Sequence, residues 1–381
     1  MSDPELDTDL LQFLQQHYYG NSNPSNPETK VLEGAEYVYN NAIDVALNLQ
    51  STRATAAVIH DQMQKRNYST KTWTSHELHP KAKDESTVDF IFTMDLLNFS
   101  FWSDKTEEER FSVDYRNRKW TGYWSLVAAL QRALDEDIPI TSPEFWVDDS
   151  KGNEEILKHV FRSATQEEIP LYQERVSCLR EAGKVLVEKY DSSFVHCIEA
   201  ADHSAAALVN LLAREFPSFK DEVSFENRKS VRFLKRAQIC VADLWAAFDG
   251  EQFGSFKDID QITIFADYRI PQILKSYGCL SYSPPLENTI RNKQLIKSGH
   301  SWEIQLRGLL PITTEPSNVY SFSAGCSIWC VEMIRREILK NNPSAKINAV
   351  LIDFFLYDLA KEREATGHDG LPHHRTRCIW Y

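Results

Sequence analysis

The stretch Ala349–Glu364 reads AVLIDFFLYDLAKERE, and its pattern indicates the fold class. Apolar side chains recur in it at spacings of three and four residues, as in a helix that buries one face. The same spacing predicts further helices in segments 31–49, 125–136, 166–189, 204–216, 230–248, 271–277 and 325–340. The sequence therefore predicts a mainly α, compact helical fold.

One small β element interrupts this helical pattern, between residues 110 and 124. Phe111, Val113 and Tyr115 alternate with polar residues, and a turn is expected at residues 117–118. Alternation on both sides of a short turn is the pattern of a β-hairpin.

The domain organisation is read from turn-forming residues near the N-terminus. Residues 19–30 read YGNSNPSNPETK, which is polar and rich in turn formers. We therefore expect residues 1–30 to be a flexible extension. Residues 31–381 are expected to form a single domain with two lobes, at about 31–150 and 151–381.

Composition excludes several classes of protein. Lys and Arg number 42 against 55 Asp and Glu, so the net charge of −13 argues against binding to nucleic-acid phosphates. Glycine, at 13 of 381 residues, is scarce, which disfavours glycine-rich cofactor folds. Aromatic residues make up 12% of the chain and serve either a large core or a flat ligand.

Membrane insertion and export are not expected. The N-terminus is acidic where a signal peptide is basic, and the longest apolar run, residues 349–360, falls short of the roughly 20 residues that span a membrane. The seven cysteines lack paired CxxC spacing, which is typical of reduced thiols. The expected location is the cytoplasm.

Searches for cofactor and metal motifs find no match. The chain contains no GxGxxG, phosphate-binding loop, G-x-S-x-G or EF-hand pattern. His76 and His79 are separated by three residues and followed by Pro80, whereas a zinc-protease helix needs a separation of four. We therefore expect neither a metal nor an organic cofactor.

Three carboxylates within apolar runs are the candidate site residues. Asp is rarely buried unless it is paired or functional, and Asp267, Asp353 and Asp358 each lie in such a run. Each has a structural alternative: Asp267 could cap a helix that begins near residue 271, Asp353 could form a buried ion pair with an arginine, and Asp358 could pair with Lys361. Together they would suit a pocket for a flat ligand that is rich in hydrogen-bond donors or cationic.

Several segments, in order, resemble one family, the queuosine salvage proteins. The matching stretches are SHELHP (75–80), DLLNFSFW (95–102), TGYWS (121–125), RALDE (132–136), FLKRAQ (233–238), TIFADYRIP (263–271), residues 353–358 and HRTRCIWY (374–381). The resemblance covers residues 31–381. It implies an N-glycosylase that hydrolyses queuosine 5′-phosphate and releases the base queuine for reuse in tRNA.

The resemblance also implies a fold similar to that of the helix-hairpin-helix DNA glycosylases. Segment 235–248 followed by 267–278 is similar to their layout of a helix and then an Asp that heads a second helix. The hairpin glycines that clamp DNA phosphates are missing, because residues 225–236 read FENRKSVRFLKR. Direct binding of nucleic acid is therefore not expected.

Residue roles follow from the same resemblance. Asp267 would be the catalytic carboxylate, which stabilises the positive charge that builds up on the ribose. Asp353 and Asp358 would bind the base. Ring contacts would come from Phe265 and Phe354, a polar contact from His76 and a phosphate contact from Lys235, for which a solvated lysine is the alternative.

Two other functions compete with this interpretation. A DNA-repair glycosylase would need a basic face and clamp glycines, and a non-catalytic protein that binds a modified base would need no acid at position 267.

Overall fold

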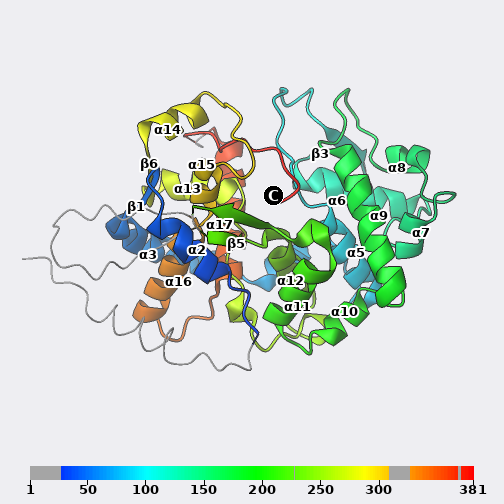
Figure 1. Cartoon of the computed structure of the whole chain (residues 1–381), viewed down its shortest axis with the longest axis horizontal. Helices are drawn as coiled ribbons and strands as arrows, with labels where there is room; N and C mark the ends of the chain where they lie inside the picture. Colours follow the sequence, from blue (N-terminus) through cyan, green and yellow to red (C-terminus); the bar gives the residue numbers. More distant parts are fainter. Residues whose placement is uncertain (1–26, 227, 309–326, 368–369) are drawn as a thin grey trace, which may run out of the picture.

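The computed structural model describes residues 27–226, 228–308, 327–367 and 370–381. Most of the expected N-terminal extension lies outside these residues, and the division into two lobes near residue 150 stays a prediction. The described part of the chain is mainly helical, with three small antiparallel sheets (Figure 1). Its helices are all too short or too polar to cross a membrane.

The elements of the first half of the chain lie on both sides of the molecule (Figure 1). They are α2 (Val31–Asn40), β1 (Val45–Leu47), α3 (Leu49–Lys65), α4 (Thr70–Ser75), α5 (Glu85–Leu96), β2 (Ser112–Tyr115), β3 (Arg118–Thr121), α6 (Tyr123–Asp135), α7 (Pro143–Val147), α8 (Glu154–Val160) and α9 (Tyr172–Lys189).

The second half supplies the central helix, α12, and further elements on both sides of it (Figure 1). Its elements are α10 (Val195–Ala200), α11 (Ala205–Glu215), η2 (Pro217–Phe219), β4 (Glu222–Phe225), β5 (Arg228–Arg232), α12 (Lys235–Ala247), η3 (Gln252–Gly254), η4 (Ile259–Gln261), α13 (Arg269–Ser276), β6 (Leu280–Tyr282), α14 (Pro284–Arg291), α15 (Ser301–Arg307), α16 (Ser327–Asn341) and α17 (Ala349–Ala365).

The strands confirm one expectation and correct two. The predicted hairpin is present as β2 and β3, with Val113 opposite Trp120. The pattern predicts one helix over 31–49, but the helix ends at Asn40 and β1 pairs with the distant strand β6. Segment 230–248 begins as β5, paired with β4, before α12 starts. In the first segment a pairing across the fold overrides the local helical pattern, and in the second a hairpin with the preceding strand does so.

The turn between β5 and α12 shows why the helix starts late. Leu234 adopts the left-handed conformation (φ 51°, ψ 36°), which ends the strand and begins the helix. The buried side of α12 then packs against α4, α5 and α11. Figure 1 shows α12 between α5, α6 and α9 on one side and α13 and α17 on the other.

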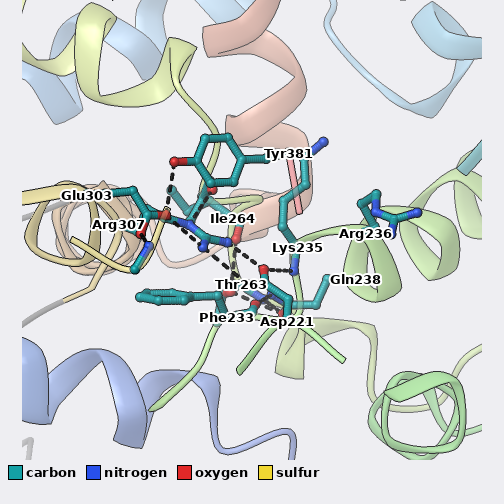
Figure 2. Close-up of polar contacts among 12 residues, drawn as sticks. Asp221, Phe233, Lys235, Arg236, Gln238, Thr263, Ile264, Glu303, Arg307 and Tyr381 are labelled. Carbon is teal, nitrogen blue, oxygen red and sulfur yellow. Dashed lines mark hydrogen bonds and ion pairs between the residues drawn. The ribbon is translucent and has the colours of Figure 1, made fainter. Parts of the chain in front are cut away.

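A buried ion-pair network fixes the start of α12. Arg307, which is 1% exposed, contacts both carboxylate oxygens of Asp221, and Asp221 accepts a hydrogen bond from the backbone N–H of Lys235 at 3.2 Å. Figure 2 shows the Arg307 guanidinium between the rings of Tyr381 and Phe233. Arg307 Nε also donates to the carbonyl of Ala266 at 3.0 Å. One guanidinium therefore holds both α12 and the segment that precedes Asp267.

Candidate active site

A cavity of about 320 Å³ lies between α12 and its two neighbouring groups of helices. One wall comes from α4, α6 and the segment after α5, and the opposite wall from the segment before α13 and from α17. All seven residues that the sequence predicts for the site line this cavity: His76, Lys235, Phe265, Asp267, Asp353, Phe354 and Asp358. His76 and Asp358, 282 positions apart in the sequence, thus line the same cavity.

Helix α12 forms the floor of the cavity. Lys235, Ile239 and Asp243 line it and recur at every fourth position, so they form one stripe along the helix. Lys235 is 5% exposed, which contradicts the alternative of a solvated lysine. Figure 2 shows its side chain extending away from Asp221, which holds only its backbone N–H.

Asp267 both caps a helix and faces the cavity. Its Oδ1 accepts from the backbone N–H groups of Arg269, at 2.7 Å, and Ile270, at 3.0 Å, at the start of α13. The predicted capping contact therefore exists. The hydrogen bonds that Asp267 accepts from the described residues all use its Oδ1. Its Oδ2 is therefore left for a ligand. Burial raises the pKa of Asp267, while the nearby ammonium of Lys235 and the two N–H groups act to lower it.

Asp353 is buried, and its partner differs from the expected arginine. Its Oδ1 accepts a hydrogen bond of 2.9 Å from the backbone N–H of Phe265. Burial, followed by the negative charge of Asp267, raises the pKa of Asp353 well above its ordinary value, and Lys235 acts against this shift. Asp353 therefore links α17 to the segment that carries Asp267.

Asp358 does not pair with Lys361, contrary to the alternative that the sequence offered. It accepts a hydrogen bond of 2.6 Å from the hydroxyl of Tyr68, and Lys361 instead contacts Glu364 at 2.6 Å. Burial raises the pKa of Asp358, and the Tyr68 hydrogen bond acts to lower it. Tyr68 lies between α3 and α4 and also lines the cavity.

Aromatic rings cover much of the cavity wall. Phe265 and Phe354 lie with their ring centroids 6.0 Å apart, and His76 stacks on Trp124 at 3.3 Å with an angle of 13° between the planes. Trp73 stacks on His79 at 3.7 Å. Flat, apolar walls interrupted by a few carboxylates suit a planar ligand with several N–H donors.

Burial favours the neutral form of the imidazoles of this wall. Burial lowers the pKa of His79 to about 3, and it also lowers the pKa of His76. His79 bridges the Trp73 carbonyl and the Tyr123 hydroxyl, each at 2.8 Å. Within the described residues, no cluster of three or more His, Cys, Asp or Glu could hold a metal ion.

Comparison with known protein families identifies the family of this chain. A family profile described as "Queuosine salvage protein" matches residues 78–381, which is most of the chain. The chain belongs to the queuosine salvage protein family. The match includes all of α12, α13 and α17, and therefore every candidate site residue except His76.

Similar members of the queuosine salvage family come from distant organisms. A Schizosaccharomyces pombe protein is 41% identical over 367 residues, covering 93% of this chain and all of the relative. A Mus musculus protein is 38% identical, covering 93% and 99%, and a Sphaerobacter thermophilus protein is 34% identical, covering 85% and 90%. All three are named queuosine 5′-phosphate N-glycosylase/hydrolase.

Some residues that line the cavity were not predicted from the sequence. Tyr68 lies between α3 and α4, Trp73 lies on the short helix α4, and Trp124 lies in the first turn of α6, before the residues at which the sequence predicted that helix to start. Asp243 lies in the run ICVADLWAAF, an acid among apolar residues, which is the same signal that singled out Asp353. That signal could have identified it.

Proposed function

We propose that this chain hydrolyses the N-glycosidic bond of queuosine 5′-phosphate and releases queuine. The observation that carries the proposal is the arrangement of Asp267. One carboxylate oxygen is held by two backbone N–H groups, and the other is left for a ligand in an aromatic cavity. The names of the relatives support the same substrate.

The proposed chemistry follows from the charge that develops on the sugar. Breaking a ribosyl C1′–N bond gives an oxocarbenium-like transition state. A carboxylate about 3 Å from C1′ stabilises that charge and can orient or deprotonate the attacking water. We assign this role to Asp267, because its capping bonds fix its position before the substrate arrives.

The leaving base makes this electrostatic role more important. Queuine is a 7-deazaguanine, so it has no N7 that an acid could protonate. Stabilisation of the sugar cation and hydrogen bonds to the base must therefore supply more of the rate enhancement.

Base recognition is assigned to the two acids of α17. Asp353 and Asp358 lie five residues apart, and carboxylates accept from the N1–H and amino group of a guanine-like base or from the protonated amine of its arm. Phe265 and Phe354 would contact the ring, and His76, stacked on Trp124, would offer a polar contact.

Lys235 is proposed to act on both the acid and the phosphate. Among the described residues that line the cavity, it is the one ammonium or guanidinium group. Burial lowers its pKa, and the charges of Asp267, Asp95 and Asp353 act in the opposite direction. We infer that it keeps Asp267 ionised and leaves a donor for the 5′-phosphate.

The order of elements supports a likeness to the helix-hairpin-helix DNA glycosylases. In this layout α12 precedes an Asp that heads a second helix, here α13. The β4–β5 strands occupy the segment where clamp glycines would lie. We therefore propose a small-molecule substrate, no direct contact with nucleic acid and, as the sequence suggested, action in the cytoplasm.

Incubation with three substrates tests the proposal. Queuosine 5′-phosphate, queuosine and GMP are each incubated with the protein, and released base is measured by chromatography. GMP is the control for the base, because it has the same ribose phosphate with a guanine that has N7 and lacks the arm. We expect base release from queuosine 5′-phosphate and none from GMP. Release from queuosine should be slower by roughly tenfold or more, because a remote dianion can help to position C1′.

The other outcomes distinguish the alternatives. Equal hydrolysis of queuosine and its 5′-phosphate would contradict the phosphate requirement. Tight binding of queuine without release of base from any substrate would favour the non-catalytic binding protein.

A further inference from the structure

Asp243 is a buried acid to which the proposed reaction gives no role. It lies on α12, is 2% exposed and lines the cavity on the same stripe as Lys235. Eight residues separate the two, which is about 12 Å along a helix. Asp243 therefore faces a different part of a bound nucleotide from the part that Lys235 and Asp267 face.

Titratable groups and Trp73 surround Asp243 on several elements. Asp95 comes from α5, Tyr123 from α6 and Asp353 from α17, and Lys235 and Cys240 share its own helix. The Trp73 side chain, from α4, forms a hydrogen bond with it. The charged neighbours are thus two acids and one ammonium.

The surplus of acids in this cavity favours a proton on one of them. Four carboxyl groups line it, those of Asp243, Asp267, Asp353 and Asp358, against one ammonium in the described part of the wall. Ionising neighbouring buried acids together is costly, so at least one is expected to keep its proton.

Asp95 adds a fifth acid behind this wall. Its Oδ1 accepts a hydrogen bond of 3.0 Å from Asn98, while its buried Oδ2 has no hydrogen-bond partner among the described residues. Burial raises the pKa of Asp95 to about 7. Burial, followed by the charge of Asp95, raises the pKa of Asp243 well above its ordinary value.

A neutral acid here would complete the hydrogen-bond pattern of the base. Ionised carboxylates only accept, so Asp353 and Asp358 suit the N–H groups of a guanine-like base but not its O6 or N3 acceptors. Two nearby donors are already used, since the Tyr68 hydroxyl donates to Asp358 and the Asn98 amide donates to Asp95. A protonated acid at Asp243 would add a donor for the base acceptors.

We propose that Asp243 is a further ligand-binding residue, which acts as the neutral carboxylic acid and donates its O–H to an acceptor atom of the nucleobase. The inference rests on the proposed function, because the guanine-like ligand comes from it. In this form the carbonyl oxygen of Asp243 can accept the hydrogen bond from the Trp73 side chain.

Two substitutions at this position separate the neutral acid from an ionised one. Asparagine is close in shape to the neutral acid and keeps one donor and one acceptor, whereas alanine has neither. We expect Asp243→Ala to weaken queuine binding roughly tenfold or more and Asp243→Asn by no more than about threefold, on the scale of one hydrogen bond. Calorimetric titration of each folded variant with queuine measures this.

A pH series provides the second readout. The queuine affinity of the wild-type protein is divided by that of Asp243→Asn at each pH, which cancels the effect of the ionisation of queuine itself. This ratio should fall as the pH rises, because ionisation of Asp243 removes its O–H donor from the wild-type protein. A loss in Asp243→Asn equal to that in Asp243→Ala, or a ratio that rises with pH, would overturn the proposal. Failure of the wild-type protein to release base from queuosine 5′-phosphate would instead overturn the proposed function.

Discussion

The backbone N–H of Phe265 donates to the carboxylate of Asp353 at 2.9 Å, and this contact joins the two halves of the candidate site. Phe265 lies two residues before Asp267, and the carbonyl of Ala266 is held by Arg307 at 3.0 Å. Side chains from α15 and α17 thus fix the backbone that presents the proposed catalytic acid. The proposed base-binding acid is also a positioning residue for Asp267.

Two substitutions at Asp353 should separate these two roles. Asp353→Asn keeps an oxygen for the Phe265 N–H but removes the charge, so we expect weaker queuine binding by roughly tenfold or more, the scale of one charged hydrogen bond. Asp353→Ala also removes the anchor and should lower kcat further. Calorimetry with queuine and initial rates with queuosine 5′-phosphate measure the two effects. Queuine binding as tight as that of the parent in both variants would mean that this acid is structural.

The hydrogen bond from Tyr68 to Asp358 predicts a shift in pH dependence. This bond favours the ionised form of Asp358, so Tyr68→Phe should raise the pKa of Asp358 further. Binding that needs the carboxylate is lost as the pH falls through this pKa, and in the variant it should be lost at a higher pH. Queuine affinity measured from about pH 5 to 8 tests this. If queuine affinity fell at the same pH in both proteins, that result would contradict a binding role for ionised Asp358.

Much of this architecture follows from sequence patterns, and the exceptions have physical causes. The period of α17 is clear because its apolar residues pack on one continuous core. The break at Asn40 is not clear from the sequence, because Ala42, Val45 and Leu49 continue the spacing of three and four residues, and only pairing with residues 280–282 makes Val45–Leu47 a strand. Contacts of this kind, across more than 200 residues, have no local signal.

The candidate site shows the same limits. Asp267 and Asp353 stand out because acids within apolar runs are rare. Their partners do not, because a backbone N–H such as that of Phe265 is present at nearly every residue and marks nothing in the sequence. The contact of Tyr68 with Asp358 could not be predicted either, because a tyrosine between two helices has many possible neighbours.

The Arg307 network should be costly to break. Asp221→Ala removes one of the two carboxylate partners of a guanidinium that is 1% exposed and leaves Glu303, and breaking a buried ion pair typically costs about 3–5 kcal/mol of unfolding free energy. Urea unfolding followed by circular dichroism measures this. The surface pair of Lys65 and Asp61 offers a matched control, because Asp61→Ala should cost at most about 1 kcal/mol. Similar losses in both variants would contradict a role of the network in holding α12.

Lys235→Met tests the two roles proposed for the lysine. The substitution keeps the length of the side chain and removes the positive charge that lowers the pKa of Asp267. Because catalysis needs ionised Asp267, the acid limb of kcat should move to higher pH, and the preference for queuosine 5′-phosphate over queuosine should shrink. Rates for both substrates across the pH range measure this. An unchanged acid limb together with an unchanged preference would exclude both roles.

Asp267→Asn tests the central claim most directly, because it separates catalysis from capping. Asparagine can accept the same two N–H groups at the start of α13, so melting temperature and queuine binding should change little. It cannot stabilise an oxocarbenium ion with a negative charge, so turnover of queuosine 5′-phosphate should fall by a factor on the order of 10² or more. If Asp267→Asn kept most of the parent's hydrolysis rate, Asp267 would be only a helix cap, and another group would have to stabilise the sugar cation.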